Sequence, residues 1–178
     1  MPSFPYIYQN QSLHPMDASF KESLWKQFGA TIDMLENAIR LCPENVWDSE
    51  LKYWYAAYHT IFYLDYYLSY DPENFRPPAP YTLSEFDPDG AYPDRVYSQG
   101  ELLEYLEFAR EKCFTLISTL TEEKAKHRFV NPYRDYSIFE MLLYNMRHVQ
   151  HHVAQLNLLL RQDIDDAPKW VSQTQKMY

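Results

Sequence analysis

Glycine is the residue that most limits how this chain can fold, because only three glycines occur among its 178 residues. The tight turns of β-barrels and β-sandwiches depend on glycine, so this scarcity opposes both architectures. Gly29, Gly90 and Gly100 also cannot form a GxGxxG or GxxxxGK[ST] phosphate loop. The sequence therefore favours an all-α fold and opposes the usual nucleotide-binding enzymes.

Four long segments carry apolar residues at spacings of three and four, which is the period of an α-helix. Two of them begin with a capping box, Ser98 to Glu101 and Ser137 to Glu140. Asp48 or Ser49 is expected to cap the second helix. The predicted helices span residues 18–41, 48–70, 98–120 and 137–162. With no competing strand-like alternation, these helices predict an all-α four-helix bundle.

The chain divides into an arm, a helical body and a tail. The predicted parts are an N-terminal arm (1–18), the bundle (19–162) and a polar C-terminal tail (163–178). Between the second and third helices, residues 72–93 hold six of the twelve prolines. This proline-rich connection can carry a crossover, so the two helices need not be antiparallel neighbours, and it is a candidate lid. A polar loop is expected over residues 121–135.

The formal charge of −9 opposes a nucleic-acid partner, because an acidic surface repels phosphates. Cys42 and Cys113 form neither a CxxC motif nor a disulfide framework, which fits buried thiols in a reducing compartment. The first residues lack the basic start and apolar run of a signal peptide, and no apolar stretch is long enough to span a membrane. We therefore expect a cytoplasmic protein without a membrane partner.

Histidines give the sequence its strongest chemical signal. His148 and His152 lie one turn apart on the core-facing stripe of the last predicted helix. His59 lies in the middle of the second helix, among tyrosines. Three neutral imidazoles would form an open metal site of the catalytic type, suited to zinc, nickel, copper or iron. Structural or surface histidines are the alternative interpretation, and His151 could replace His152 as the partner of His148.

Two stretches resemble the DinB-like (damage-inducible) superfamily. One is Ala56-Ala-Tyr-His-Thr-Ile, which contains His59. The other, more specific one is His148-Val-Gln-His-His152-Val-Ala-Gln155-Leu, although many relatives have glycine in place of Ala154. The resemblance covers about residues 19–162. It implies an up-up-down-down-like four-helix bundle with a divalent ion, zinc or nickel, held by His59, His148 and His152.

The resemblance also suggests an activity, since the superfamily includes metal-dependent thiol S-transferases and thiol-dependent isomerases. A bound divalent ion lowers the pKa of a coordinated thiol, which could then attack a small electrophilic molecule. Asn145 or Gln155 would orient a ligand ring or a polar group of the substrate. The candidate pocket walls are Tyr55, Tyr58 and Tyr63, although core and interface packing explains these tyrosines more readily than a substrate role. With no general base evident beyond the histidines, hydrolysis is less supported than thiol transfer.

A second class of function remains open. The many aromatic residues of the second helix could form an exposed apolar face, which favours a homodimer. In that case the chain would be a non-enzymatic dimeric bundle, or a small-molecule binding protein, with a structural or vestigial metal site.

Overall fold

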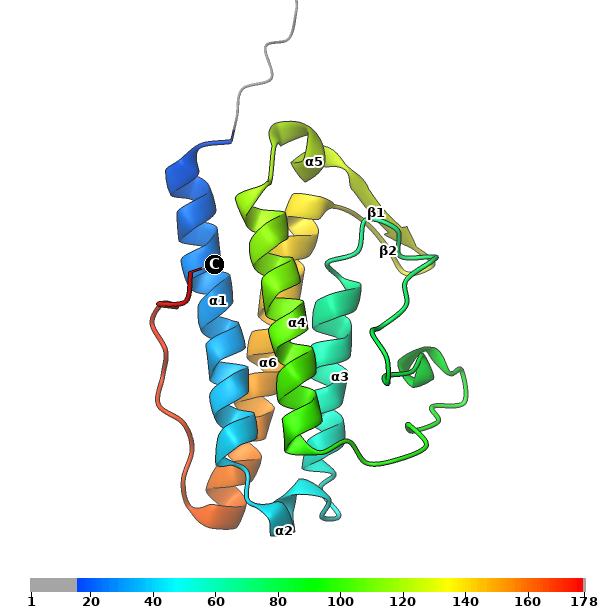
Figure 1. Cartoon of the computed structure of the whole chain (residues 1–178), viewed down its shortest axis with the longest axis vertical. Helices are drawn as coiled ribbons and strands as arrows, with labels where there is room; N and C mark the ends of the chain where they lie inside the picture. Colours follow the sequence, from blue (N-terminus) through cyan, green and yellow to red (C-terminus); the bar gives the residue numbers. More distant parts are fainter. Residues whose placement is uncertain (1–15, 178) are drawn as a thin grey trace, which may run out of the picture.

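The computed structural model describes residues 16–177, and within that range the chain is predominantly helical, as predicted. Four long helices lie side by side along the longest axis of the molecule (Figure 1). They are α1 (Ala18–Leu41), α3 (Tyr53–Tyr66), α4 (Gln99–Ser118) and α6 (Ile138–Ile164). Most of the predicted N-terminal arm, residues 1–15, lies outside the described residues.

The helices form two antiparallel pairs, α1 with α4 and α3 with α6. Lys21 near the start of α1 donates to the carbonyl of Ser118 at the end of α4 (2.8 Å). In the second pair, Asn145 donates to the carbonyl of Leu64 in the last turn of α3 (2.9 Å). The pairs pack together through α1 against α6 and α3 against α4. Because α3 and α4 run in the same direction, residues 67–98 must return along the molecule before α4 can begin (Figure 1).

Side-chain caps set the starts of three long helices. Ser98 and Glu101 form the predicted reciprocal capping box at α4. Ser137 accepts a hydrogen bond from the backbone N–H of Glu140 at the start of α6. Asp17 accepts from the backbone N–H of Ser19 and caps α1. These helices therefore begin within one residue of the predicted positions.

The second predicted helix, residues 48–70, is wrong at both ends. A short helix α2 (Glu44–Trp47) comes first, and α3 begins at Tyr53 after Lys52, whose φ is 47°. Asp48 does not cap α3, and its carboxylate instead accepts from the indole N–H of Trp54 (2.8 Å). That indole is buried, so its N–H needs a partner more than the helix start does.

The predicted polar loop at 121–135 also contains regular structure, so the expectation of no strands is wrong. A one-turn helix α5 (Glu122–Lys126) leads into β1 (Arg128–Asn131) and β2 (Arg134–Ser137). The two strands pair antiparallel, with Arg128 opposite Ser137. Each strand has four residues, too few for an alternating pattern to stand out. The fully buried ring of Phe129 fixes the hairpin against α3 through Tyr66 (centroids 5.3 Å apart).

Most aromatic residues of α3 are buried within this chain, and they do not form an exposed apolar face. Tyr53, Tyr58 and Phe62 are each 0% exposed, and Trp54 is 3% exposed. The argument from these residues for a homodimer therefore loses its basis.

None of the helices in the described residues has the length and apolar character that crossing a bilayer demands.

The C-terminal tail returns along α1 (Figure 1). The indole N–H of Trp25 donates to the carbonyl of Lys176 (2.8 Å), and the backbone N–H of Thr174 donates to the carbonyl of Lys26 (3.0 Å). The approach is close at Gly29, where a Cβ would lie 2.4 Å from Cγ2 of Thr174. A glycine in the middle of this helix is thus required by packing rather than by a turn.

Candidate metal centre

Three histidines meet between α3 and α6. His59 comes from α3, and His148 and His152 come from successive turns of α6. The ring centroids are 4.5 Å apart for His148 and His152, and 4.8 Å for His59 and His152. One nitrogen from each ring lies within 4.8 Å of the others, so the three residues could hold one metal ion. The antiparallel packing of α3 on α6 brings them together.

The environment keeps the imidazoles of His148 and His152 neutral. Burial, together with the neighbouring His152 and His59, lowers the pKa of His148 to about 3. Burial and His59 likewise lower the pKa of His152 to about 4. A neutral imidazole offers a lone pair, which is what a metal requires. Nδ1 of His148 is buried without a hydrogen-bond partner, so this donor set fits a divalent ion that prefers nitrogen ligands.

Glu85 is the functional candidate that the sequence did not reveal. It lies in the 3-10 turn η1 (Ser84–Phe86), within the proline-rich connection. Its Oε2 lies 2.7 Å from Nδ1 of His59, while its Oε1 is buried without a hydrogen-bond partner. The structure thus adds a carboxylate next to the histidines. No sequence spacing links two residues 26 positions apart in a helix and a loop.

The predicted pocket tyrosines divide into two groups. Tyr63 and Tyr55 border the histidines, with ring centroids 4.8 Å and 6.5 Å from that of His59. Tyr58 is fully buried, and its hydroxyl donates to the carbonyl of Thr82 (2.9 Å). Tyr58 therefore packs the connection against α3, whereas Tyr55 and Tyr63 lie where a substrate could meet them. Tyr67, which was not predicted, packs edge-on against His148 at 5.6 Å.

Gln155 and Asn145 have different surroundings. Oε1 of Gln155 lies 2.7 Å from Nδ1 of His152, as expected for a group that orients a ligand ring. Asn145 is buried, and its amide bonds the carbonyl of Leu64 rather than an imidazole. Asn145 thus joins α6 to α3 beside the centre, and its contact with a ligand ring is not observed.

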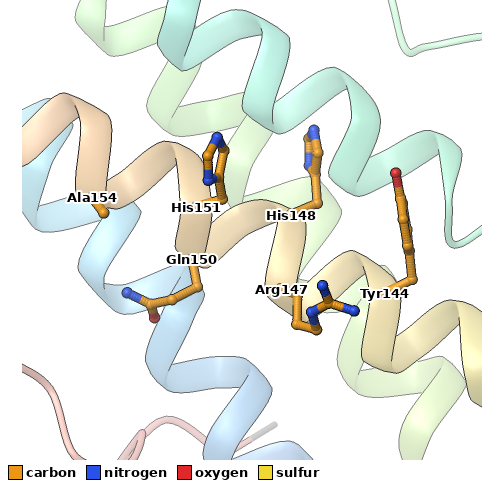
Figure 2. A pocket seen from close by; sticks show the side chains of 6 residues that line it. All are labelled: Tyr144, Arg147, His148, Gln150, His151 and Ala154. Atoms are coloured by element: carbon orange, nitrogen blue, oxygen red, sulfur yellow. The ribbon is translucent and has the colours of Figure 1, made fainter.

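His151 is exposed and lies outside the group of three. Figure 2 shows it on the same side of α6 as His148 and Tyr144, whereas Arg147 and Gln150 project from the other side. Together with Ala154, these residues line an open cavity of about 590 Å³. Of the three clustered histidines, His148 alone lines this cavity, which could admit a small molecule.

Comparison with known proteins places the chain in a family. No curated protein and no solved structure matches it. A family model described as the DinB superfamily matches residues 27–156, a range that contains all three histidines and Glu85. The chain, with its helical fold and its histidine cluster, therefore belongs to the DinB superfamily.

Proposed function

We propose that this protein binds one divalent metal ion, zinc or nickel, through His59, His148 and His152, and acts as a metal-dependent thiol S-transferase. The observation that carries the proposal is the convergence of three imidazoles from α3 and α6, two of them with pKa values far below the usual range. When bound, the ion would lower the pKa of a coordinated thiol and so supply a thiolate nucleophile.

The hydrogen-bond acceptors around the rings support this arrangement. A carboxylate oxygen only accepts, so next to Glu85 it is His59 that donates its Nδ1–H, and Nε2 keeps the lone pair. In the same way, the amide oxygen of Gln155 accepts the Nδ1–H of His152. Both rings then offer Nε2 to the centre, where a metal would need it.

The attacking thiol must come from a small molecule. Burial raises the pKa of the Cys42 thiol to about 12 and raises that of Cys113 as well. Both cysteines are buried, so neither presents a thiolate to a substrate. A low-molecular-weight thiol and a small electrophile fit the open cavity beside His148. Tyr63, Tyr67 and Tyr55 would shield the reacting groups from water.

The first test measures metal in protein purified without a histidine tag. Mass spectrometry should find about one divalent ion per chain in the wild type and none in His59→Ala or His148→Ala. His151→Ala is the matched control and should keep its metal. Absence of metal in the wild type, after incubation with zinc or nickel, would contradict the proposal.

The second test measures transfer. The metal-loaded protein is given a panel of small thiols with a fluorogenic electrophile such as monochlorobimane. Turnover that a chelator abolishes and the metal restores would support the transferase. A protein that holds metal and binds the thiol without turnover would instead be a small-molecule binding protein, the second class of function that the sequence allows.

A further inference from the structure

The carboxylate of Glu85 is buried next to the ring of His59. Its side chain is 3% exposed, and the 2.7 Å contact with His59 involves only one of its two oxygens. A buried negative charge is costly unless a positive charge or several donors compensate it. One carboxylate oxygen contacts the ring of His59, and the other is buried without a hydrogen-bond partner. The structure has therefore placed a negative charge where a cation would be favoured.

Glu85 belongs to a short stretch, residues 82–86, that is docked on α3. Two tyrosine hydroxyls of α3 hold its backbone: Tyr58 donates to the carbonyl of Thr82 (2.9 Å) and Tyr63 donates to that of Glu85 (3.2 Å). The ring of Phe86 packs edge-on against Phe62 of the same helix (5.0 Å). The docked stretch thus covers the turns of α3 that carry His59.

These contacts join the proline-rich connection to the metal centre. The geometry points to Glu85 as a positioning residue: it fixes the tautomer of His59, and it couples metal binding to the docking of residues 82–86 on α3. The inference rests on the proposed metal site. A cation at the histidines favours the docked carboxylate, and by linkage the docked carboxylate favours the cation to the same degree.

The first experiment compares zinc affinities by competition with a chromophoric chelator. Glu85→Gln removes the charge from the docked stretch, and Glu73→Gln makes the same change at an exposed position of the same connection. We expect Glu85→Gln to bind zinc about 10- to 100-fold more weakly than the wild type. Glu73→Gln should bind as the wild type does. Equal affinities for the two variants would overturn the inference.

The second experiment uses hydrogen exchange, which reports docking without any activity. Adding zinc to the wild type should slow exchange at the backbone N–H groups of Phe86 and Asp87, which bond within the stretch. The same addition to Glu85→Gln, at saturating zinc, should slow exchange in α6 around His148 and not in the stretch. Zinc-induced protection of the stretch in both proteins would contradict the coupling.

Two controls separate the possible failures. A wild type that binds no zinc would overturn the proposed metal site and this inference together, whereas a wild type that binds zinc as tightly as Glu85→Gln would overturn only the inference. Tyr63→Phe tests docking without touching the carboxylate, because it removes one hydroxyl that holds the stretch. Tyr63→Phe should weaken zinc binding less than Glu85→Gln does. Far-UV circular dichroism of each variant checks that it is folded.

Discussion

In the described residues, each antiparallel helix pair contains a polar cluster among its packed side chains. Between α1 and α4, the fully buried guanidinium of Arg110 contacts three carboxylates: Asp33, Glu36 (2.6 Å) and Glu107 (3.0 Å). Between α3 and α6, three imidazoles meet one carboxylate, and two buried polar atoms have no hydrogen-bond partner. The first cluster is complete within the protein, and the second is not.

The difference indicates what each cluster does. A buried charge with matched partners holds helices in register, and its loss leaves those partners uncompensated. Buried groups without partners reduce stability, so a protein that keeps them at a cavity is expected to use them on a ligand. Substitutions in the two clusters should therefore have opposite consequences for stability and for metal binding.

The largest expected effect is on stability and comes from the complete cluster. Arg110→Met should lower the free energy of unfolding by about 3–5 kcal/mol, because it removes the fully buried guanidinium that pairs with the carboxylates of Asp33 and Glu36. Urea unfolding followed by circular dichroism measures the loss. Arg40→Met is the control, since it removes an exposed arginine from the same Glu36 and should cost less than about 1 kcal/mol. Similar losses for both variants would mean that the buried Arg110 cluster stabilises the fold no more than the exposed Arg40 ion pair does.

The incomplete cluster should give the reverse result. His148→Leu should weaken zinc binding by more than about 100-fold, since losing a ligand exceeds the effect of losing its hydrogen-bond partner. The same change should leave the metal-free protein as stable, or about 1 kcal/mol more stable, because it removes an unpartnered buried nitrogen. Chelator competition and urea unfolding measure the two quantities. A strongly destabilised metal-free variant would place His148 with the structural residues.

Acid should destabilise the metal-free protein through the histidine cluster. The pKa of His148 is lowered to about 3 and that of His152 to about 4, from a usual value of 6.5. The unfolded chain therefore binds more protons in this range, and stability falls as the pH drops from about 6.5 toward 4. From pH 7 to pH 5, we expect a loss of about 1–2 kcal/mol from His148 alone, measured as the difference from His148→Leu.

Between pH 7 and pH 5, the contribution of the histidines to stability can be separated from that of the carboxylates. The pKa of Glu101 is lowered to about 2 by Arg95 and Ser98, and the pKa of Glu36 is also lowered. Their contributions persist above the usual carboxyl pKa of about 4.5 and are lost only in stronger acid. If His148→Leu loses as much stability at pH 5 as the wild type, the histidine cluster is not the acid-sensitive part.

The smallest effect is expected at the rim of the complete cluster. Lys176 of the C-terminal tail reaches Glu36 at 2.7 Å, but its side chain is 43% exposed. Lys176→Ala should therefore cost less than about 1 kcal/mol in urea unfolding. A loss in the free energy of unfolding close to that of Arg110→Met would show that the C-terminal tail contributes to the stability of the cluster as well as contacting it.

Much of the helical framework could be predicted from sequence because local signals determine it. Ser98, Ser137 and Asp17 cap their helices through neighbours two or three residues away, which a pattern can show. The start of α3 could not be predicted, because Asp48 bonds the indole of Trp54 instead of capping. The hairpin at 128–137 escaped notice because its strands are shorter than the pattern needs.

The candidate site, like the helical framework, could be predicted only where local spacing determines it. The spacing of His148 and His152 places both rings on one face of a helix, and the superfamily resemblance implied His59 as the third member. Glu85 could not be found in this way, since its contact with His59 depends on how a proline-rich connection folds back onto α3. Neither helical periodicity nor composition describes such a path. The roles of Tyr58 and Asn145 likewise depend on the packing of segments far apart in the chain.

The parallel arrangement of α3 and α4 has a consequence for the length of the connection between them. The chain must travel back along α3, a distance of about 20 Å for its 14 residues. Fewer than about ten extended residues would reach that far, and residues 67–98 supply about three times that number. The surplus folds against α3 and presents Glu85, while residues 87–91 are exposed. Insertions or deletions at 87–91 should therefore be accommodated at the surface while the order of the helices stays the same.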